Sequence, residues 1–275
     1  MEEQTHIGLP VELERDIFEL AAWLHPETIQ TLILVAKRVC IWIEPLLYHV
    51  VLLRGGGDSE RLLRMMDSKP PEFLREHVRH LALSSTISRS DVKRILSMCT
   101  NITDLALWTG DTYPDLLSEM GRLNNLAQLS INLYEVFGRN QSPSPVQFEQ
   151  PAFSHLTHLD IFSTLPEVLW PVFGKIPHLT HLSFTDYYVP ELLAHVIDVC
   201  QSLQVLIVLW TQEAEHGIQE PDITDQRFCL ISCPDFEEDW NLGAWGGMDF
   251  WAKSDAFVER KRQGLITGAV YWVPA

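Results

Sequence analysis

The stretch Cys99-Thr100-Asn101-Ile102-Thr103-Asp104-Leu105-Ala106-Leu107 decides how the centre of this 275-residue chain folds. Its apolar residues stand at offsets of 0, 3, 6 and 8, and the same offsets recur in later copies. We call the third apolar residue of each copy its marker. The markers, including that of a weaker first copy, are Leu81, Leu105, Leu129, Leu159, Leu182 and Leu206, at steps of 24, 24, 30, 23 and 24 residues. Such a repeat predicts units that stack, because one unit cannot cover its own apolar face.

Each copy joins a helical segment to a short strand. In one copy, Val92, Ile95, Leu96 and Cys99 have the spacing of an amphipathic helix and precede a strand at residues 105–107. A step of about 20–29 residues is typical of leucine-rich repeats. The pattern therefore predicts an α/β fold class, a short leucine-rich-repeat solenoid or horseshoe, behind a separate N-terminal module of three helices.

Alternate residues of each predicted strand face the concave side of such a horseshoe. The side chains of the marker and of the residue two positions later point into the core, so the side chains of the residues before, between and after them point to the concave face. Small polar residues and a few aromatic residues occupy these positions, a composition that suits protein recognition. The candidate target-binding residues are Trp108, Asn132, His158, Asp160, Phe162, His181 and Thr185. The alternative is that these side chains are simply solvated or are packed by the insertion loop at residues 138–145.

The first 54 residues lack the repeat and are predicted to form three short helices. The first helix carries a stripe of large apolar residues at helical spacing: Leu9, Leu13, Ile17, Leu20 and Leu24. The second begins at Pro26, and the third extends from Val39 to Val50. A segment this short buries little surface by itself. We therefore expect a partner protein, the neighbouring repeats, or both to cover these faces.

Four motifs in this segment resemble an F-box over roughly residues 7–50. They are Leu9-Pro10-Val11-Glu12-Leu13, Ile17-Phe18, Leu34-Val35-Ala36-Lys37 and Trp42. With the repeats behind it, the chain is similar to the large group of fungal F-box-like proteins with leucine-rich repeats. The segments Trp42–Tyr48 and Asp249–Trp251 are familiar in that group.

The resemblance implies a function as the substrate-recognition subunit of an SCF-type cullin–RING ubiquitin ligase. F-box helices dock on a Skp-type adaptor, and the repeats then bind an unidentified protein substrate. Carried over by position, the adaptor-binding residues are Leu9, Pro10, Leu13, Ile17, Leu34, Val35 and Trp42. The alternative is a leucine-rich-repeat interaction scaffold with no role in ubiquitin transfer, in which the N-terminal helices only cap the repeats.

These patterns divide the chain into four parts. Residues 1–54 form the F-box-like helical module, and residues 55–74 form a linker and first helix. Residues 75–235 form the leucine-rich-repeat solenoid, and residues 236–275 form a C-terminal cap rich in aromatic residues. An atypical last segment is expected because the final repeat must close its exposed core.

Composition narrows the classes of partner. The net charge of −17 and the pI of about 4.9 disfavour nucleic acid and anionic membranes as partners. No apolar run approaches the roughly 18 residues that a membrane span requires. The acidic start, Met1–His6, lacks the features of a secretory signal. Five cysteines without framework spacing indicate reduced thiols, so we expect a cytoplasmic or nuclear location, or both.

No motif indicates catalysis, a cofactor or a metal, so we expect a protein that is not an enzyme. The pair His155/His158 ends in a strand, where a three-residue separation turns the two side chains to opposite faces. Cys229 and Cys233 stand without a second pair at zinc-finger spacing. No nucleophile motif, phosphate-binding loop or dinucleotide fingerprint is present. The third class of function is a hydrolase on a solenoid-like fold.

Overall fold

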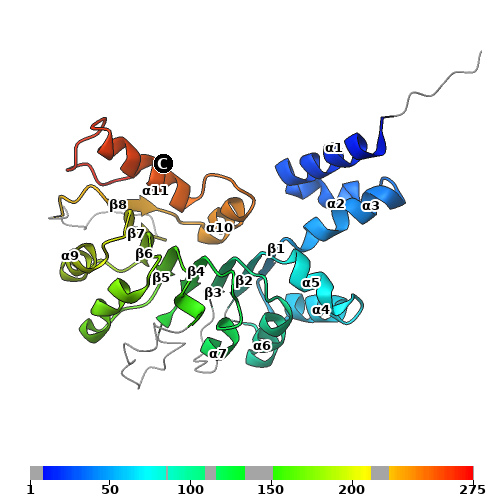
Figure 1. Cartoon of the computed structure of the whole chain (residues 1–275), viewed down its shortest axis with the longest axis horizontal. Coiled ribbons are helices and arrows are strands. Elements are labelled where there is room, and N and C mark those ends of the chain that lie inside the picture. The colour runs from blue at the N-terminus through cyan, green and yellow to red at the C-terminus, as the bar shows by residue number, and fades with distance from the viewer. Residues whose placement is uncertain (1–8, 85, 109–115, 134–150, 212–222, 275) are drawn as a thin grey trace, which may run out of the picture. The chain divides into compact units, whose positions relative to one another are not determined.

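The computed structural model describes residues 9–84, 86–108, 116–133, 151–211 and 223–274 (Figure 1). The chain divides into two compact units, Met1–Val50 and Val51–Ala275. We call them the N-terminal unit and the sheet unit and describe each by itself.

The N-terminal unit is helical. Its elements are α1 (Val11–Leu24), the 3₁₀ helix η1 (Pro26–Thr28), α2 (Ile29–Leu32), α3 (Lys37–Ile43) and the 3₁₀ helix η2 (Glu44–Tyr48). Its small core contains Ala22, Ile29, Val39 and Ile43.

The predicted third helix, residues 39–50, is wrong in its second half. The α-helix ends at Ile43, a 3₁₀ turn follows, and Val50 already begins a strand. Pro45 explains the break, because proline lacks the N–H that a continuing α-helix needs.

In the residues that the structure describes, the sheet unit is built on eight strands in one sheet, ordered as they follow one another along the chain. They are β1 (Val50–Leu53), β2 (His80–Ser84), β3 (Asp104–Trp108), β4 (Gln128–Ile131), β5 (His158–Ile161), β6 (His181–Thr185), β7 (Val205–Trp210) and β8 (Phe228–Ser232). Every pairing from β2 to β8 is parallel.

The register of the sheet follows the markers. Leu81 pairs with Leu105, Leu105 with Leu129, and the same partnership continues through Leu159 and Leu182 to Leu206. The predicted strand positions are therefore confirmed from β2 to β7. The turn-rich insertion predicted at residues 138–145 lies outside the described residues.

Helices cover the marker face of the sheet (Figure 1). They are α4 (Gly56–Met66), α5 (Pro71–His77), α6 (Arg89–Met98), α7 (Leu116–Met120), the 3₁₀ helices η4 (Pro151–Phe153) and η5 (Glu167–Lys175), and α9 (Pro190–Val199). The markers beneath them are almost fully buried, as are Cys99 and Cys200, which pack as small apolar groups as predicted. Burial raises the pKa of the Cys99 thiol to about 12.

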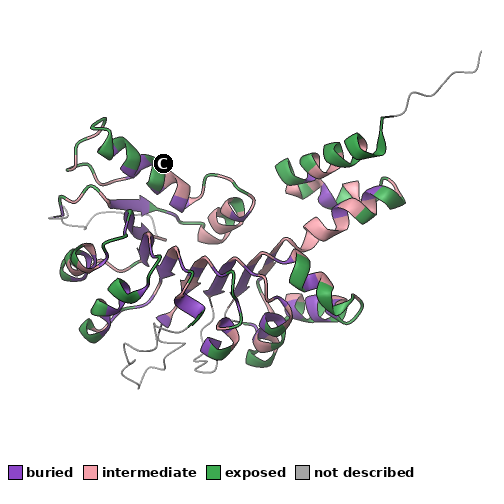
Figure 2. Ribbon diagram, viewed as in Figure 1, coloured by how far each residue is buried: buried purple, intermediate pink, exposed green. Residues whose placement is uncertain are grey.

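Two C-terminal helices cover the other face over the later strands. They are α10 (Phe236–Ala244) and α11 (Phe250–Arg262), and both begin at an aspartate that caps the helix. Val205, Ile207 and Leu209 of β7 are buried in one apolar cluster with Trp251 and Phe257 of α11. Figure 2 shows these strands buried. The cluster joins the C-terminal segment to the sheet as one core.

The predicted fold class is therefore wrong. The structure does not have the predicted combination of a three-helix F-box-like module and a leucine-rich-repeat horseshoe. Its described residues form an α/β architecture with one eight-stranded sheet, parallel from β2 to β8, and helices on both faces. The repeat period indicates the spacing of the strands along the chain. It does not indicate whether the face of the sheet opposite the markers stays exposed to solvent. Apolar residues at the supposed concave positions, such as Ile207, require cover, as is usual for parallel sheets.

Candidate functional site

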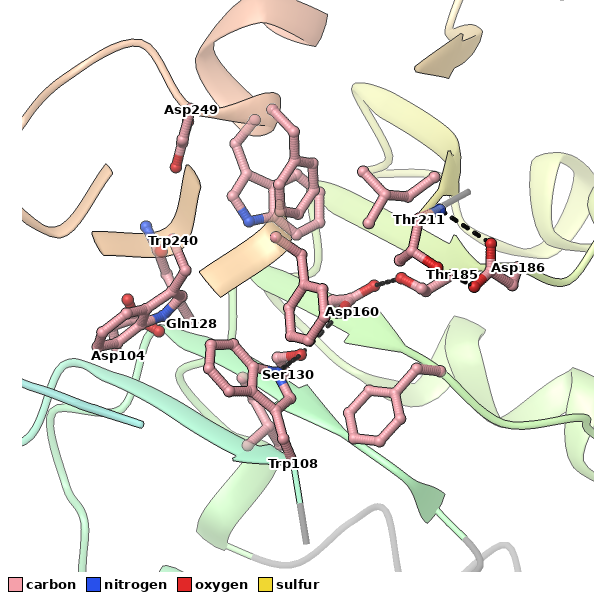
Figure 3. Close-up of a pocket in the computed structure, with 16 residues that line it drawn as sticks. Asp104, Trp108, Gln128, Ser130, Asp160, Thr185, Asp186, Thr211, Trp240 and Asp249 are labelled. Carbon is pink, nitrogen blue, oxygen red and sulfur yellow. Dashed lines mark hydrogen bonds between the residues drawn. The ribbon is translucent and has the colours of Figure 1, made fainter. Parts of the chain in front are cut away.

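The sheet unit contains a cavity of about 320 Å³ between the sheet and the starts of α10 and α11 (Figure 3). Its volume lies at the lower end of the range for small-molecule pockets. Its lining residues are Asp104, Trp108, Gln128, Leu129, Ser130, Asp160, Phe162, Thr185, Asp186, Leu209, Thr211, Phe236, Trp240, Asp249, Phe250 and Trp251. We call it the pocket.

The carboxyl ends of the strands form one side of the pocket. Trp108 is the last residue of β3, and Phe162, Asp186 and Thr211 directly follow β5, β6 and β7. Parallel strands bring their carboxyl ends to one edge of the sheet, where ligands of open α/β folds usually bind. The topology therefore explains why residues from distant repeats meet here.

Aromatic side chains form the walls. The Trp108 ring meets Phe236 edge to face at 5.0 Å and 88°, and meets Trp240 at 5.9 Å and 81°. The indole Nε1 of Trp108 donates to the hydroxyl of Ser130 at 3.2 Å, which fixes the orientation of the ring. Edge-to-face contact at these distances is a favoured packing arrangement of aromatic rings, so the three rings form one continuous wall.

Asp160 lies on the floor of the pocket, 8 % exposed. Its two carboxylate oxygens accept from the Ser130 hydroxyl at 2.7 Å and from the Thr185 hydroxyl at 2.8 Å (Figure 3). Burial raises the pKa of Asp160, and the hydrogen bonds from these hydroxyls oppose that shift. The carboxyl group is therefore held in place by neutral donors from the strands on either side.

Asp186 occupies an unusual backbone conformation beside the pocket. Its φ is 51°, a left-handed value that aspartate tolerates better than most residues. Its backbone N–H donates to the carbonyl of Leu209 at 2.8 Å, and its carboxylate accepts from the backbone N–H and the hydroxyl of Thr211. These bonds hold the carboxylate against the end of β7.

Asp249 places a third carboxylate at the start of α11. It caps this helix by accepting from the backbone N–H of Ala252 at 2.8 Å. Burial raises the pKa of Asp249 to about 6, and the neighbouring carboxylates of Asp239 and Asp104 add to the shift. Gly243 of α10 lies so close that a Cβ there would collide with the Asp249 carboxylate.

The pocket carries negative charge with no basic residue in its lining. It contains four aspartates, and none of its sixteen described lining residues is lysine, arginine or histidine. Lys253, on α11, donates to Asp239 at 3.1 Å, Arg54 pairs with Glu237 at 2.8 Å, and Nδ1 of His80 lies 3.3 Å from the carboxylate of Asp104. An aromatic enclosure of this charge attracts cations.

The structure brings together four of the seven predicted target-binding residues: Trp108, Asp160, Phe162 and Thr185 all line the pocket. It does not bring Asn132, His158 or His181 into the lining. The histidines lie in the same face of the sheet, beneath Trp251, at 5.0 and 6.0 Å between ring centroids.

The residues that the sequence reasoning missed come mostly from the C-terminal segment. They include Asp186 and the group Phe236, Trp240, Asp249, Phe250 and Trp251. For the C-terminal group the signal is the concentration of aromatic residues and aspartates after residue 235, from which the sequence alone predicts only a cap.

The N-terminal unit carries a separate feature, an exposed apolar face on and beside α1. Its large apolar side chains and their exposed fractions are Leu9 60 %, Leu13 50 %, Ile17 54 %, Leu20 59 % and Leu24 63 %. The predicted adaptor-binding residues Leu34 and Val35 are also exposed, at 81 % and 58 %. Pro10 is exposed and Trp42 is half-buried. We call the five residues on and beside α1 the α1 face.

A groove of about 400 Å³ adjoins this face within the N-terminal unit. Leu9, Ile17 and Phe18 line it together with Glu14 and Arg38. The Arg38 guanidinium donates to both carboxylate oxygens of Glu14, at 3.0 and 2.5 Å, and thereby lowers the pKa of that carboxyl. The ion pair links α1 to α3 beside the apolar face.

Within the described ranges, no cluster of three or more histidine, cysteine or acidic side chains has a geometry that could hold a metal ion. In the same part of the chain, no helix has both the length and the apolar composition needed to cross a lipid bilayer. Comparison with protein-family models and with curated proteins gave no match.

Proposed function

We propose that this chain is a substrate-recognition subunit of an SCF-type cullin–RING ubiquitin ligase. In this proposal the N-terminal unit docks on a Skp-type adaptor, and the sheet unit binds the protein target on the side that holds the pocket. The ubiquitin chemistry takes place on other subunits. The observation that carries the proposal is the α1 face.

The α1 face reverses the usual distribution of side chains on a surface helix. Such a helix normally turns its large apolar residues toward the core. Here the only α1 residue that is fully buried is Ala22, and Leu13, Ile17, Leu20 and Leu24 are at least half exposed. A contiguous apolar surface of this kind usually marks an interaction site. Covering the exposed half of one such side chain stabilises a complex by about 1 kcal/mol.

The resemblance of residues 7–50 to an F-box indicates which kind of partner protein would bind this face. An apolar helical surface pairs with an apolar groove or with other helices. Leu34 and Val35, which the resemblance assigns to adaptor binding, are exposed like the α1 face. Both observations favour a Skp-type adaptor.

Co-expression with Skp-type adaptors followed by affinity capture tests the proposal. We expect the wild-type chain to retain an adaptor. The double variant Leu13→Asp plus Ile17→Asp should bind at least about tenfold more weakly, because two charges would enter an apolar interface. Both side chains are exposed, so circular dichroism of this variant should match the wild type.

A matched control introduces the same charges elsewhere. Val168 and Leu265 of the sheet unit are 54 % and 65 % exposed, so Val168→Asp plus Leu265→Asp should leave adaptor binding unchanged. Absence of binding by the wild type, or equal binding by the Leu13/Ile17 variant, contradicts the proposal. Such a result leaves the alternative of an interaction scaffold without a ubiquitin role.

A further inference from the structure

We propose that the pocket binds an organic cation, the ammonium or guanidinium group at the end of a basic side chain or of a free amine. The inference concerns the sheet unit alone and holds whether or not the N-terminal unit docks on an adaptor. Three properties of the pocket carry it: uncompensated charge, aromatic enclosure and size.

The first property is the uncompensated charge. Asp160 and Asp186 accept hydrogen bonds from hydroxyl groups and a backbone amide, and Asp249 accepts from a backbone amide. These donors orient the carboxylates without neutralising them. A buried carboxylate normally has a cationic partner or loses its charge. A cation from a ligand would supply such a partner inside the pocket.

The second property is the aromatic enclosure. Trp108, Trp240 and Trp251 line the same space as the aspartates, and Trp108 meets Trp240 at nearly a right angle. Aromatic ring faces attract ammonium and guanidinium groups, and most strongly where water is excluded. Walls of this kind select an alkylated or delocalised cation over a small, strongly hydrated metal ion.

The third property is the size of the cavity. A volume of about 320 Å³ admits a side chain or a small molecule, and a folded domain could only rest on the rim. The pocket thus fits one cationic group with a short apolar stem.

One further group bears on the source of the cation, which is either a basic side chain of a protein or a free organic amine. The indole Nε1 of Trp240 is buried and has no hydrogen-bond partner in the described part of the chain. A buried donor of this kind normally finds an acceptor. An amino acid within a peptide carries carbonyl acceptors beside its cationic side chain, and a free tetraalkylammonium ion carries none. Of these two sources, a basic side chain within a peptide is the one that carries an acceptor for such a donor.

Titration of the full chain with small probes, followed by tryptophan fluorescence and ligand-observed NMR, tests the proposal. The cationic probes are the N-acetyl methylamides of lysine, trimethyllysine and arginine, and the neutral probe is the same derivative of norleucine. Tetramethylammonium represents a free organic cation. We expect at least one cationic amide to bind about tenfold more tightly than the norleucine amide.

Two variants locate the binding. Asp186→Asn keeps the size of the side chain and tolerates a positive φ, so it should fold normally and weaken binding of cations about tenfold. Asp198→Asn, at an exposed position on α9, is the matched control and should change nothing. Trp240→Phe keeps a ring and removes Nε1, so it should weaken the amide probes more than tetramethylammonium.

Some outcomes distinguish the two sources of the cation, and others overturn the proposal. Tighter binding of the amides than of tetramethylammonium identifies a basic side chain, and the reverse order identifies a free organic cation. Binding of norleucine amide as tight as that of the cationic amides, or cation binding that Asp186→Asn does not change, overturns the proposal. Absence of binding by every cation into the millimolar range also overturns it.

Discussion

His158 and His181 stack ring on ring across β5 and β6, with 4.0 Å between ring centroids and 7° between their planes. The Nε2 atom of His181 lies 2.8 Å from the Asp255 carboxylate of α11, and the edge of Trp251 meets His158. The pair therefore lies at the contact between the sheet and the helix that forms one wall of the pocket.

This stack makes the stability of the sheet unit dependent on pH. Burial, together with the neighbouring His181, lowers the pKa of His158 from 6.5 to about 3, and the Asp255 carboxylate opposes the shift. The unfolded chain therefore binds a proton at His158 between these values and the folded chain does not. Stability contributed by neutral His158 is fully present above about pH 6.5 and is lost as the pH falls toward 3.

His158→Phe should reduce this loss. Urea unfolding followed by tryptophan fluorescence between pH 7 and pH 4 should give a pH dependence smaller by up to about one proton. His178→Phe, at an exposed position, is the control and should keep the wild-type dependence. An unchanged dependence in His158→Phe contradicts the prediction.

Lys261 predicts a second effect on stability. This lysine is 2 % exposed, and its Nζ donates to the carbonyl of Phe228 in β8 at 2.8 Å. Lys261→Met should lower the free energy of unfolding by about 1–3 kcal/mol, because a buried carbonyl loses its donor. Arg260→Met, on the exposed side of the same helix, should change it by less than about 0.5 kcal/mol. Equal effects of the two substitutions in urea unfolding would refute this account.

The strands were predictable from the sequence because their cause is local and repeated. The marker position, which Leu129 occupies in one copy, must be buried in every copy. The marker spacing therefore predicts which residues pair. The second layer of helices was not predictable in this way. Its contact with the sheet joins Trp251 to His158, more than 90 residues earlier, and no periodic pattern records such a contact.

The sequence therefore predicts the pocket residues that lie on the strands and not those of the C-terminal segment. Strand alternation identified Trp108 and Asp160, because their position relative to a marker determines which face they share. Trp240 and Asp249 reach the same space only when the C-terminal segment folds back onto the sheet. In the N-terminal unit the sequence predicted a helix bearing an apolar stripe, and helical spacing alone cannot tell whether such a stripe faces a core or solvent.

Cation binding in the pocket should strengthen as the pH rises from about 5 to 7. A cation prefers an ionised carboxylate, and Asp249, with its pKa raised to about 6, ionises across this range. The carboxylates of Asp239 and Asp104 favour its protonated form, and the ammonium of Lys253 favours its ionised form. Burial raises the pKa of Asp160 as well, which acts in the same direction.

Asp249→Asn tests the origin of this dependence. Asparagine caps a helix about as well as aspartate, so α11 should remain intact. Titration with the trimethyllysine amide at both pH values should then show weaker binding and a smaller change with pH than in the wild type. A variant that keeps the full wild-type dependence would exclude Asp249 as its source.

The close approach of α10 to Asp249 gives the last prediction. Gly243 has no side chain, and a Cβ at this position would collide with the Asp249 carboxylate, which caps α11 and lines the pocket. Gly243→Ala should therefore force the carboxylate away from its place, lower the free energy of unfolding by about 1–3 kcal/mol, and weaken cation binding.

Gly57→Ala is the matched control for this substitution. Gly57 lies in α4, and a Cβ there would meet nothing within 4 Å. Alanine at this position should raise stability by about 0.4–1 kcal/mol, because it restricts the unfolded chain and fits the helix. Gly57→Ala should leave cation binding unchanged. If Gly243→Ala proves as stable as Gly57→Ala and binds cations like the wild type, the position of Asp249 does not depend on the close contact with α10.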